Sequence, residues 1–405
     1  LSLVGSEMCI RDRDSKALKE YQEKLKRARC TGNLIDPDES LTVRMNRIQR
    51  AKRDVKYLVE TYLPHYATAD CADFQIAHAN KVMNDPIYKG YAEWGRGLAK
   101  SVWNDVIIPL WLWINGETHY MCIVSDTFDR ACDLLEDLRA EFEANELLKH
   151  DFGEQYNPGY WEKGNFVTMN GFICKAFGAK QKVRGLRKGA HRPDLWIIDD
   201  LETPQTIKNN RMQDDYADWI EADVLATMTG KRRRLIGANN RFASRMVQTI
   251  LKQRHPDWDW HLVKAYDPVT YEPAWKSMYS PQFYRQQEKD MGILAAHAEY
   301  NHVPLVKGKI FKPEMVKWGK LPDLHTMNAI VAHWDIAYAG TDTSDFNACK
   351  IWGRHKNDFW LIDGFVKQSK MKLCVQWMCM KQAEFRAKGI ICFWQYESQF
   401  WNDEV

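Results

Sequence analysis

A short apolar run that ends in two consecutive carboxylates, Leu195 to Asp200, constrains the fold of this 405-residue chain more than any other feature. Consecutive apolar side chains over so short a run are typical of a strand that is buried on both faces. Further strands are predicted at 119–125 and 234–237. Between the first of these and the acidic strand, behind Ser125 or Thr127 as the cap, apolar residues recur at helical spacing: Phe128, Ala131, Leu134, Leu135, Leu138 and Phe142. The alternation predicts an α/β domain built on a parallel sheet with helices on both faces.

A loop that contains two glycines, a lysine and a serine precedes a predicted helix that begins near Val102. Binding of nucleotide phosphates needs convergent backbone N–H groups, a lysine for the outer phosphates and a hydroxyl for Mg²⁺. The residues that could supply these groups are Gly95, Arg96, Gly97, Leu98, Ala99, Lys100 and Ser101. The match to GxxxxGK[ST] is degenerate, because Trp94 and Ala99 stand at the glycine positions. A plain turn is therefore the alternative interpretation.

The two carboxylates that end the acidic strand complement this loop. Asp199 is placed to hold Mg²⁺ through water, and Asp200 is placed to polarise the attacking water, with Glu202 as the fallback base. A buried strand that runs into an acidic turn is the alternative interpretation. The acidic strand lies about a hundred residues after a Lys-Ser loop, within an alternating α/β pattern. This position favours the nucleotide-binding interpretation.

Basic residues gather at two places in the same region, in a glycine-containing run from Lys180 to Arg192 and in a run from Lys231 to Arg234. The glycines make the first run a predicted loop, and a loop near the carboxyl ends of the strands is suited to contact with phosphate or DNA. A basic turn before an edge strand is the alternative for the second run. DNA contacts are predicted for Arg184, Arg187, Arg232 and Arg233.

The pattern changes after residue 328. Three strands joined by tight turns are predicted at 329–337, 346–353 and 359–365, followed by a helix over 371–388 and a strand from Ile390. This order is the opening of an RNase H-like domain. If the first and fourth strands are neighbours, Asp335 and Glu397 face each other, and such a pair needs divalent cations to bridge it. Asp345 is a third acid at the start of the second strand, and chance acids at strand ends are the alternative.

These motifs together resemble those of the large terminase subunits of tailed bacteriophages, over most of residues 55–405. The loop Arg96 to Ser101 matches the form R-x-x-(G/A)-K-(S/T) of that family, and the segment D-x-A-x-A-G-T-D-T-S-D-F-x-A from Asp335 resembles the opening of its nuclease. The resemblance implies that Arg96 points at the phosphates and that Asp335, Asp345 and Glu397 lie at the nuclease metals. It also implies a nucleotide-sensing role for Arg184, Arg187 or Arg192, a γ-phosphate or water contact for Asn239 or Asn240, and an adenine contact near Gln75.

The resemblance implies a P-loop ATPase domain followed by a partial RNase H-like α/β nuclease domain. ATP and Mg²⁺, or Mn²⁺ in the nuclease site, would be the cofactors. Such a subunit drives double-stranded DNA into a prohead and cuts concatemeric DNA, in the host bacterial cytoplasm and transiently on the prohead. Its implied partners are double-stranded DNA, a portal protein, a small terminase subunit and further copies in a ring. The alternatives are an ATP-dependent translocase or helicase without nuclease activity, and a non-enzymatic DNA-binding assembly protein.

The domain boundaries follow from the same patterns. Residues 1–13 lack the features of a signal peptide and are predicted to be a non-native leader. A solvated helical arm is expected over 14–54, the ATPase domain over 55–266, a linker region over 267–327 and the partial nuclease domain over 328–405. The third metal-binding Asp of the family is expected beyond Val405. The 10 scattered cysteines predict reduced thiols, the net charge of +3 is too mild to prove a nucleic-acid partner, and no apolar run reaches the roughly 18 residues of a membrane span.

Overall fold

The computed structural model describes residues 16–203, 205–303, 317–336 and 346–396. The chain forms two compact units, which divide between Val306 and Lys307, and each unit is described by itself. The predicted leader, residues 1–13, and two predicted metal ligands, Asp345 and Glu397, lie outside the described residues. Within the described residues, no helix has both the length and the apolar character that crossing a membrane requires.

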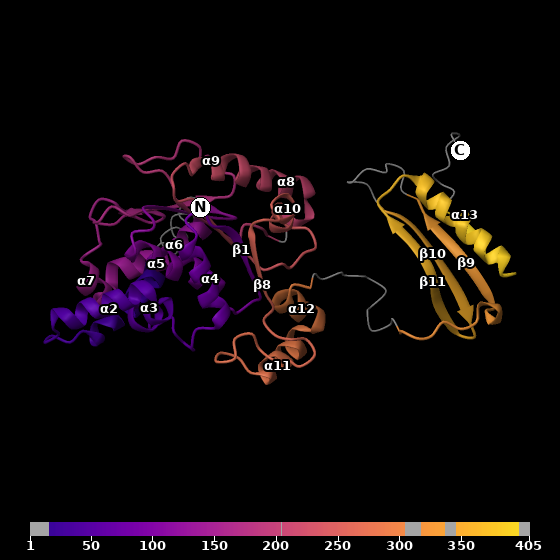
Figure 1. Ribbon diagram of the computed structural model, residues 1–405, viewed down its shortest axis with the longest axis horizontal. Helices are drawn as coiled ribbons and strands as arrows, with labels where there is room; N and C mark the ends of the chain where they lie inside the picture. Colours follow the sequence, from indigo (N-terminus) through magenta and orange to yellow (C-terminus); the bar gives the residue numbers. More distant parts are fainter. Residues whose placement is uncertain (1–15, 204, 304–316, 337–345, 397–405) are drawn as a thin grey trace, which may run out of the picture. The chain divides into compact units, whose positions relative to one another are not determined.

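Unit 1 is built on an eight-stranded sheet in the order β3-β4-β5-β2-β6-β7-β1-β8 (Figure 1). From β5 to β8 in this order every neighbouring pair is parallel, and β3 and β4 add a short antiparallel extension. The predicted parallel sheet is thereby confirmed, with strands close to the predicted ranges. The bounds are β1 Lys89–Trp94, β2 Tyr120–Ser125, β3 Trp161–Glu162, β4 Asn165–Val167, β5 Ile173–Gly178, β6 Leu195–Asp199, β7 Arg234–Ala238 and β8 Asp259–Val263.

Helices cover both faces of this sheet, because successive side chains of each buried strand point to opposite faces. On β6, Ile197 joins a core with α3, α5 and α6, whereas Trp196 and Ile198 join a second core with α8 and α10. The two groups of helices lie below and above the sheet in Figure 1. The first group is α2 Leu41–Arg53, α3 Val55–Tyr62, α4 Asp73–Asn84, α5 Ile108–Ile114, α6 Phe128–Ala144 and α7 Glu146–Phe152, and the second is α8 Asn210–Trp219, α9 Leu225–Thr227 and α10 Val247–Arg254.

The N-terminal helices belong to unit 1 and contact its other helices, which corrects the expectation of a solvated arm. Residues 16–28 are helical, and a 3₁₀ turn, Arg29–Leu34, leads toward α2. Arg47 of α2 donates to the carboxylate of Asp151 at 2.7 Å, and the indole of Trp111 donates to the carbonyl of Ala51 at 3.1 Å. The charged pattern suggested exposure because the partners of these charges lie far away in the sequence.

Part of the predicted linker region belongs to unit 1. The helices α11 Pro281–Met291 and α12 Ile293–Asn301 lie within residues 267–327, and their side chains Tyr284 and Tyr300 are buried in the same core as β1. Trp275 donates to the carbonyl of Asp70 at 2.7 Å, so this segment folds back across the chain. The segment therefore contributes to the core that contains β1, and its residue Glu299 accepts a hydrogen bond from the N–H of Arg96 in the phosphate loop.

Unit 2 has a four-stranded sheet in the order β11-β10-β9-β12 with one helix, α13. β10 pairs antiparallel with both β9 and β11, and β12 pairs parallel with β9. The predicted strands and helix are confirmed, as is the neighbouring position of the first and fourth strands. The bounds are β9 Ala329–Asp335, β10 Asn347–His355, β11 Asp358–Lys367, α13 Met371–Ala387 and β12 Phe393–Tyr396.

Candidate functional site

The carboxyl ends of β1, β7 and β6 meet at one edge of the sheet in unit 1. Asp199 at the end of β6 lies opposite Ala238 of β7, and Ala238 lies opposite Ala92 of β1. The phosphate loop follows β1, and Asn239 follows β7. The sheet therefore brings the loop and the acidic pair to the same edge, with Asn239 on the strand between them, at the end where parallel α/β sheets bind ligands.

The phosphate loop has a backbone conformation that matches its motif. Gly97 has φ +82°, and Ala99 has φ +61° at the position that the strict motif gives to glycine. A left-handed conformation costs a residue with a side chain roughly 1–2 kcal/mol. Ala99 holds this conformation nonetheless, so the degenerate sequence still forms the left-handed turn for which the motif uses glycine.

The N–H groups of this loop divide into two sets. Those of Gly95, Arg96 and Leu98 donate to backbone carbonyls of the protein. Those of Gly97 and Ala99 have no backbone acceptor among the described residues, and the helix that starts at Lys100 leaves its first N–H groups free, as every helix does. The second set is available to an anion, since a helix N-terminus also favours negative charge.

Two buried amides brace the loop. Gln75 is fully buried, and its amide accepts from the N–H of Ala72 at 2.9 Å and donates to the carbonyl of Leu98 at 3.1 Å. Asn104 donates to the carbonyl of Lys100 at 2.7 Å, and His78 hydrogen-bonds to Asn104 at 2.8 Å. Both ends of the Gln75 amide are thus occupied by the protein. The adenine contact near this residue stays a prediction.

The C-terminal end of α12 lies against the loop. A guanidinium nitrogen of Arg96 lies 3.4 Å from the carboxylate of Glu299, and the amide of Asn240 donates to the Glu299 carbonyl at 2.9 Å. A side chain at Gly95 would approach the carbonyl oxygen of Tyr300 to 2.2 Å, which explains the glycine there. Arg96 is exposed and faces a carboxylate, so it must exchange this partner to reach a phosphate. Since the amide nitrogen of Asn240 already donates to α12, Asn239 is the better candidate of the two to donate to a ligand.

The two acids after β6 have opposite environments. Asp199 is fully buried, whereas Asp200 takes φ +48° and turns its half-exposed carboxylate outward, 3.7 Å from the guanidinium of Arg130. Glu202 is buried and accepts from the N–H of Val247 at 2.8 Å and from a side-chain amide at 3.1 Å, and burial raises its pKa to about 6. Asp200 is therefore the acid open to solvent, and the Glu202 carboxylate is held by the protein.

The structure adds Asp105, which sequence reasoning missed. Its carboxyl group lies within hydrogen-bond reach of that of Asp199, and both side chains are buried. Burial, and then the charge of Asp199, raise the pKa of Asp105 well above its usual range. Burial also raises the pKa of Asp199, and Ser101 and Lys100 oppose that rise. The available signal was a single acid within the apolar run 102–114.

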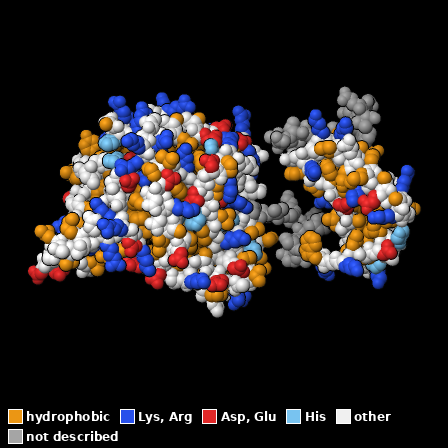
Figure 2. Space-filling model, viewed as in Figure 1, with side chains coloured by type: hydrophobic (Ala, Val, Ile, Leu, Met, Phe, Trp, Pro, Cys, Tyr) orange, Lys and Arg blue, Asp and Glu red, His pale blue; other side chains and the backbone are white. Residues whose placement is uncertain are grey.

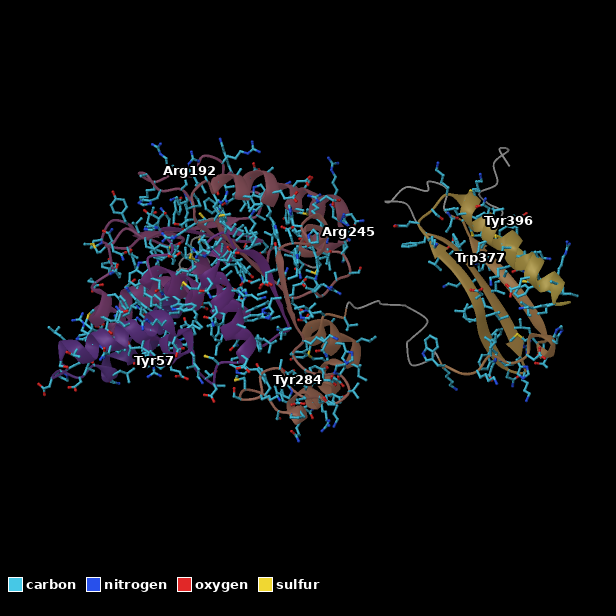
Figure 3. The ribbon with its side chains drawn as sticks, viewed as in Figure 1. Tyr57, Arg192, Arg245, Tyr284, Trp377 and Tyr396 are labelled. Atoms are coloured by element: carbon cyan, nitrogen blue, oxygen red, sulfur yellow. The ribbon has the colours of Figure 1, made fainter. Side chains whose placement is uncertain are left out.

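The predicted DNA-binding arginines lie at two edges of the sheet. The run 180–192 begins after the carboxyl end of β5, where Arg184 pairs with Asp223, but it ends at the amino end of β6. The interpretation of the whole run as lying near the carboxyl ends is thus wrong for Arg192, which lies on the upper rim in Figure 3, where Lys and Arg side chains gather in Figure 2. Arg187 and Arg233 are exposed, and Arg232 makes two 2.9 Å hydrogen bonds to the carboxylate of Glu117.

In unit 2, the structure describes one of the three predicted metal ligands. Asp335 is exposed at the carboxyl end of β9. Tyr396, the last described residue of β12, lies opposite Trp334. The end of β12 therefore lies beside the end of β9. The predicted approach of Glu397 to Asp335 stays a prediction, because Glu397 is outside the described residues.

Comparisons with known proteins find similarity in structure and not in sequence. No protein-family model matches the chain, and no curated protein matches it. Among solved structures, the large terminase of bacteriophage HK97 is 13% identical, with a TM-score of 0.41 over 85% of this chain and 74% of that one. The large terminase of a thermophilic bacteriophage, in complex with ADP, is 10% identical, with a TM-score of 0.38 over 80% and 82%. The bacteriophage Phi-29 viral genome packaging motor assembly is 10% identical, with a TM-score of 0.32 over 78% and 93%. Two of these three solved structures are thus large terminases, and the third is a viral packaging motor.

Proposed function

We propose that unit 1 binds and hydrolyses ATP at the edge formed by the ends of β1, β7 and β6. The proposal depends on one observation. At this edge, loop N–H groups without a backbone acceptor in the described part of the chain meet a buried carboxylate, Asp199, and an outward one, Asp200. The N–H groups would bind the phosphates, and Lys100 would balance their charge. Asp200 would orient and polarise the attacking water.

The residues at this edge fit a magnesium ion. Mg²⁺ prefers oxygen ligands, and the fully buried carboxylate of Asp199 lies beside the hydroxyl of Ser101. Ser101 lies in the first turn of the helix after the loop, and its hydrogen bond to Asp199 lowers the pKa of that carboxyl. Ser101 and Asp199 would hold the ion, which when bound neutralises charge on the phosphate oxygens.

Genome packaging is the process that we propose this hydrolysis serves. The chain would act as a large terminase subunit that moves double-stranded DNA into a prohead, together with a portal protein, a small terminase subunit and further copies in a ring. The support is the sequence resemblance of Arg96 to Ser101 and of the segment from Asp335 to that family, together with the exposed Arg187 and Arg233. Arg184 and Arg232 would contact DNA by exchanging their present carboxylate partners.

Lys100→Ala tests the ATPase. We expect this variant to lose ATP hydrolysis on the order of 10²–10³-fold, because a preorganised positive charge at the phosphates would be removed. DNA-stimulated hydrolysis by the full chain is the measurement. Lys56→Ala is the control, since Lys56 lies on α3 and is paired with Glu60. Hydrolysis by Lys100→Ala at the wild-type rate would overturn the assignment, and no hydrolysis by the wild type would favour a non-enzymatic DNA-binding protein.

Metal-dependent cleavage of DNA by unit 2 is the second proposed activity. The parallel pairing of β9 with β12 favours it, because that pairing brings the end of a second strand beside Asp335. Asp335→Asn is expected to abolish Mg²⁺- or Mn²⁺-dependent nicking of plasmid DNA, since a neutral amide is a poorer ligand for a hard cation. Asp358→Asn, at the exposed start of β11 in the same sheet, is the control. Equal nicking by Asp335→Asn and wild type would contradict the assignment, and no nicking by either would favour a translocase without nuclease activity.

A further inference from the structure

Arg241 follows the two asparagines at the carboxyl end of β7, the strand that lies between β1 and β6. Its backbone N–H donates to Nδ1 of His302 at 3.2 Å. The other ring nitrogen, Nε2, therefore carries the proton, and it donates to the carbonyl of Val263 at 3.0 Å. The same carbonyl accepts the N–H of Gly95 at 2.9 Å. Through His302, the backbone of Arg241 is thus held beside the first glycine of the phosphate loop.

The guanidinium group of Arg241 forms no ion pair with the residues that the structure describes, and its Nε is buried without a hydrogen-bond acceptor there. The carboxylate of Glu299 lies 3.4 Å from Arg96 instead. Arg245, four residues later, shows the usual arrangement of an arginine with a structural role, since its guanidinium lies 2.7 Å from the carboxylate of Asp214. Arg241 therefore has a donor group that the described part of the fold does not use.

Positive charge gathers at this corner of the sheet. Burial lowers the pKa of His302, and the hydrogen bond to the Val263 carbonyl opposes this effect. The charges of Arg241, Lys100 and Lys264 lower that pKa further, because all three lie close enough to disfavour an imidazolium. The corner that contains the phosphate loop thus presents three cations, and such a cluster favours an anionic ligand.

We infer that Arg241 binds the terminal phosphate of ATP, which rests on the proposed nucleotide site and adds a residue outside the phosphate-loop motif and the acidic pair. The loop follows β1 and would hold the inner phosphates, whereas Asp200 follows β6 and would activate the water that attacks the last one. Because β7 lies between these strands, groups that follow β7 lie where the phosphate chain would end. A guanidinium there would form charge-assisted hydrogen bonds to γ-phosphate oxygens. Unlike Arg96, Arg241 has no carboxylate partner among the described residues to leave.

Binding of a diphosphate and of a triphosphate by Arg241→Gln separates this role from a structural one. ADP lacks the γ-phosphate, so we expect its affinity to stay at the wild-type value. The affinity for AMP-PNP, a triphosphate that resists hydrolysis, should fall by about 10–100-fold, the effect of losing a hydrogen bond to a charged group. Arg241→Lys, which keeps the charge but not the paired donors, should bind AMP-PNP with intermediate affinity. A structural role would instead lower the melting temperature and weaken the binding of both nucleotides alike.

Calorimetric titration of the full chain with each nucleotide, in the presence of Mg²⁺, is the measurement. Arg245→Gln is the matched control, because Arg245 lies in the same segment and is already paired with Asp214. We expect this control to bind both nucleotides as the wild type does. Wild-type affinity for AMP-PNP in Arg241→Gln, or an equal loss for the two nucleotides, overturns the inference, while binding by the wild type still supports the nucleotide site. Failure of the wild type to bind either nucleotide overturns both.

Discussion

The Asp200→Asn protein is expected to bind ATP with nearly wild-type affinity and to hydrolyse it on the order of 10²–10⁴-fold more slowly, the range attributed to general acid–base catalysis. The half-exposed carboxylate of Asp200 turns away from the core, so its replacement leaves the loop N–H groups, Lys100 and Asp199 in place. An amide of the same shape cannot accept the proton of the attacking water. Single-turnover hydrolysis separates this chemical step from binding, which is followed with a fluorescent nucleotide.

Glu202→Gln is the companion variant, because Glu202 is the alternative base. Its carboxylate accepts from Val247 and Gln213, so we expect a modest effect on hydrolysis. Loss of hydrolysis in Glu202→Gln but not in Asp200→Asn would transfer the role to Glu202. A second sign would be the pH profile. Since the pKa of Glu202 is raised to about 6, a base at this position would be protonated, and the rate would fall, as the pH drops through that value.

Arg234→Met is expected to lower the free energy of unfolding by about 3–5 kcal/mol, because several buried hydrogen bonds from a charged donor, each worth roughly 1.5–3 kcal/mol, are lost together. Arg234 begins β7 and is 1% exposed. Its guanidinium donates to the Glu117 carboxylate at 3.1 Å and to the carbonyls of Val82, Met83, Asp85 and Glu117 at 2.8–3.1 Å. It therefore ties the end of α4 and the segment before β2 to β7, and methionine would remove a charged donor from each of these acceptors, of which the Glu117 carboxylate retains Arg232. Urea unfolding followed by circular dichroism is the measurement.

Arg233→Met is the matched control, one residue earlier in the same basic run. Arg233 is exposed, and the structure uses its backbone N–H, which methionine retains, to bond the carbonyl of Pro86. We expect a change within about 0.5 kcal/mol, as for other surface positions. Equal destabilisation by the two variants would show that the hydrogen bonds of Arg234 are not what stabilises this corner.

The sequence by itself determined the local elements and the two halves of the nucleotide site. The strand Leu195–Asp199 and the helix from Phe128 were predicted because apolar periodicity reports burial over a few residues. The location of Asp199 and Asp200 was predicted because residues at the carboxyl end of a parallel strand lie at one edge of the sheet. In unit 2, three strands, a helix and a fourth strand were predicted for the same reason, and the structure confirms them.

Only the tertiary structure decided which distant residues meet. In the strand order β6-β7-β1, the strand that Asn239 follows lies between the phosphate loop and the acidic pair. No local sequence pattern contains that order. The N-terminal helices were expected to be solvated and residues 267–327 to be a linker region. The residues that they contact, such as Asp151 and Asp70, are remote in the sequence. Asp105 was missed for the same reason. Periodicity shows that an acid interrupts an apolar helix, but only the packing of that helix on β6 shows that it faces Asp199, since burial and charge depend on neighbours that long-range folding supplies.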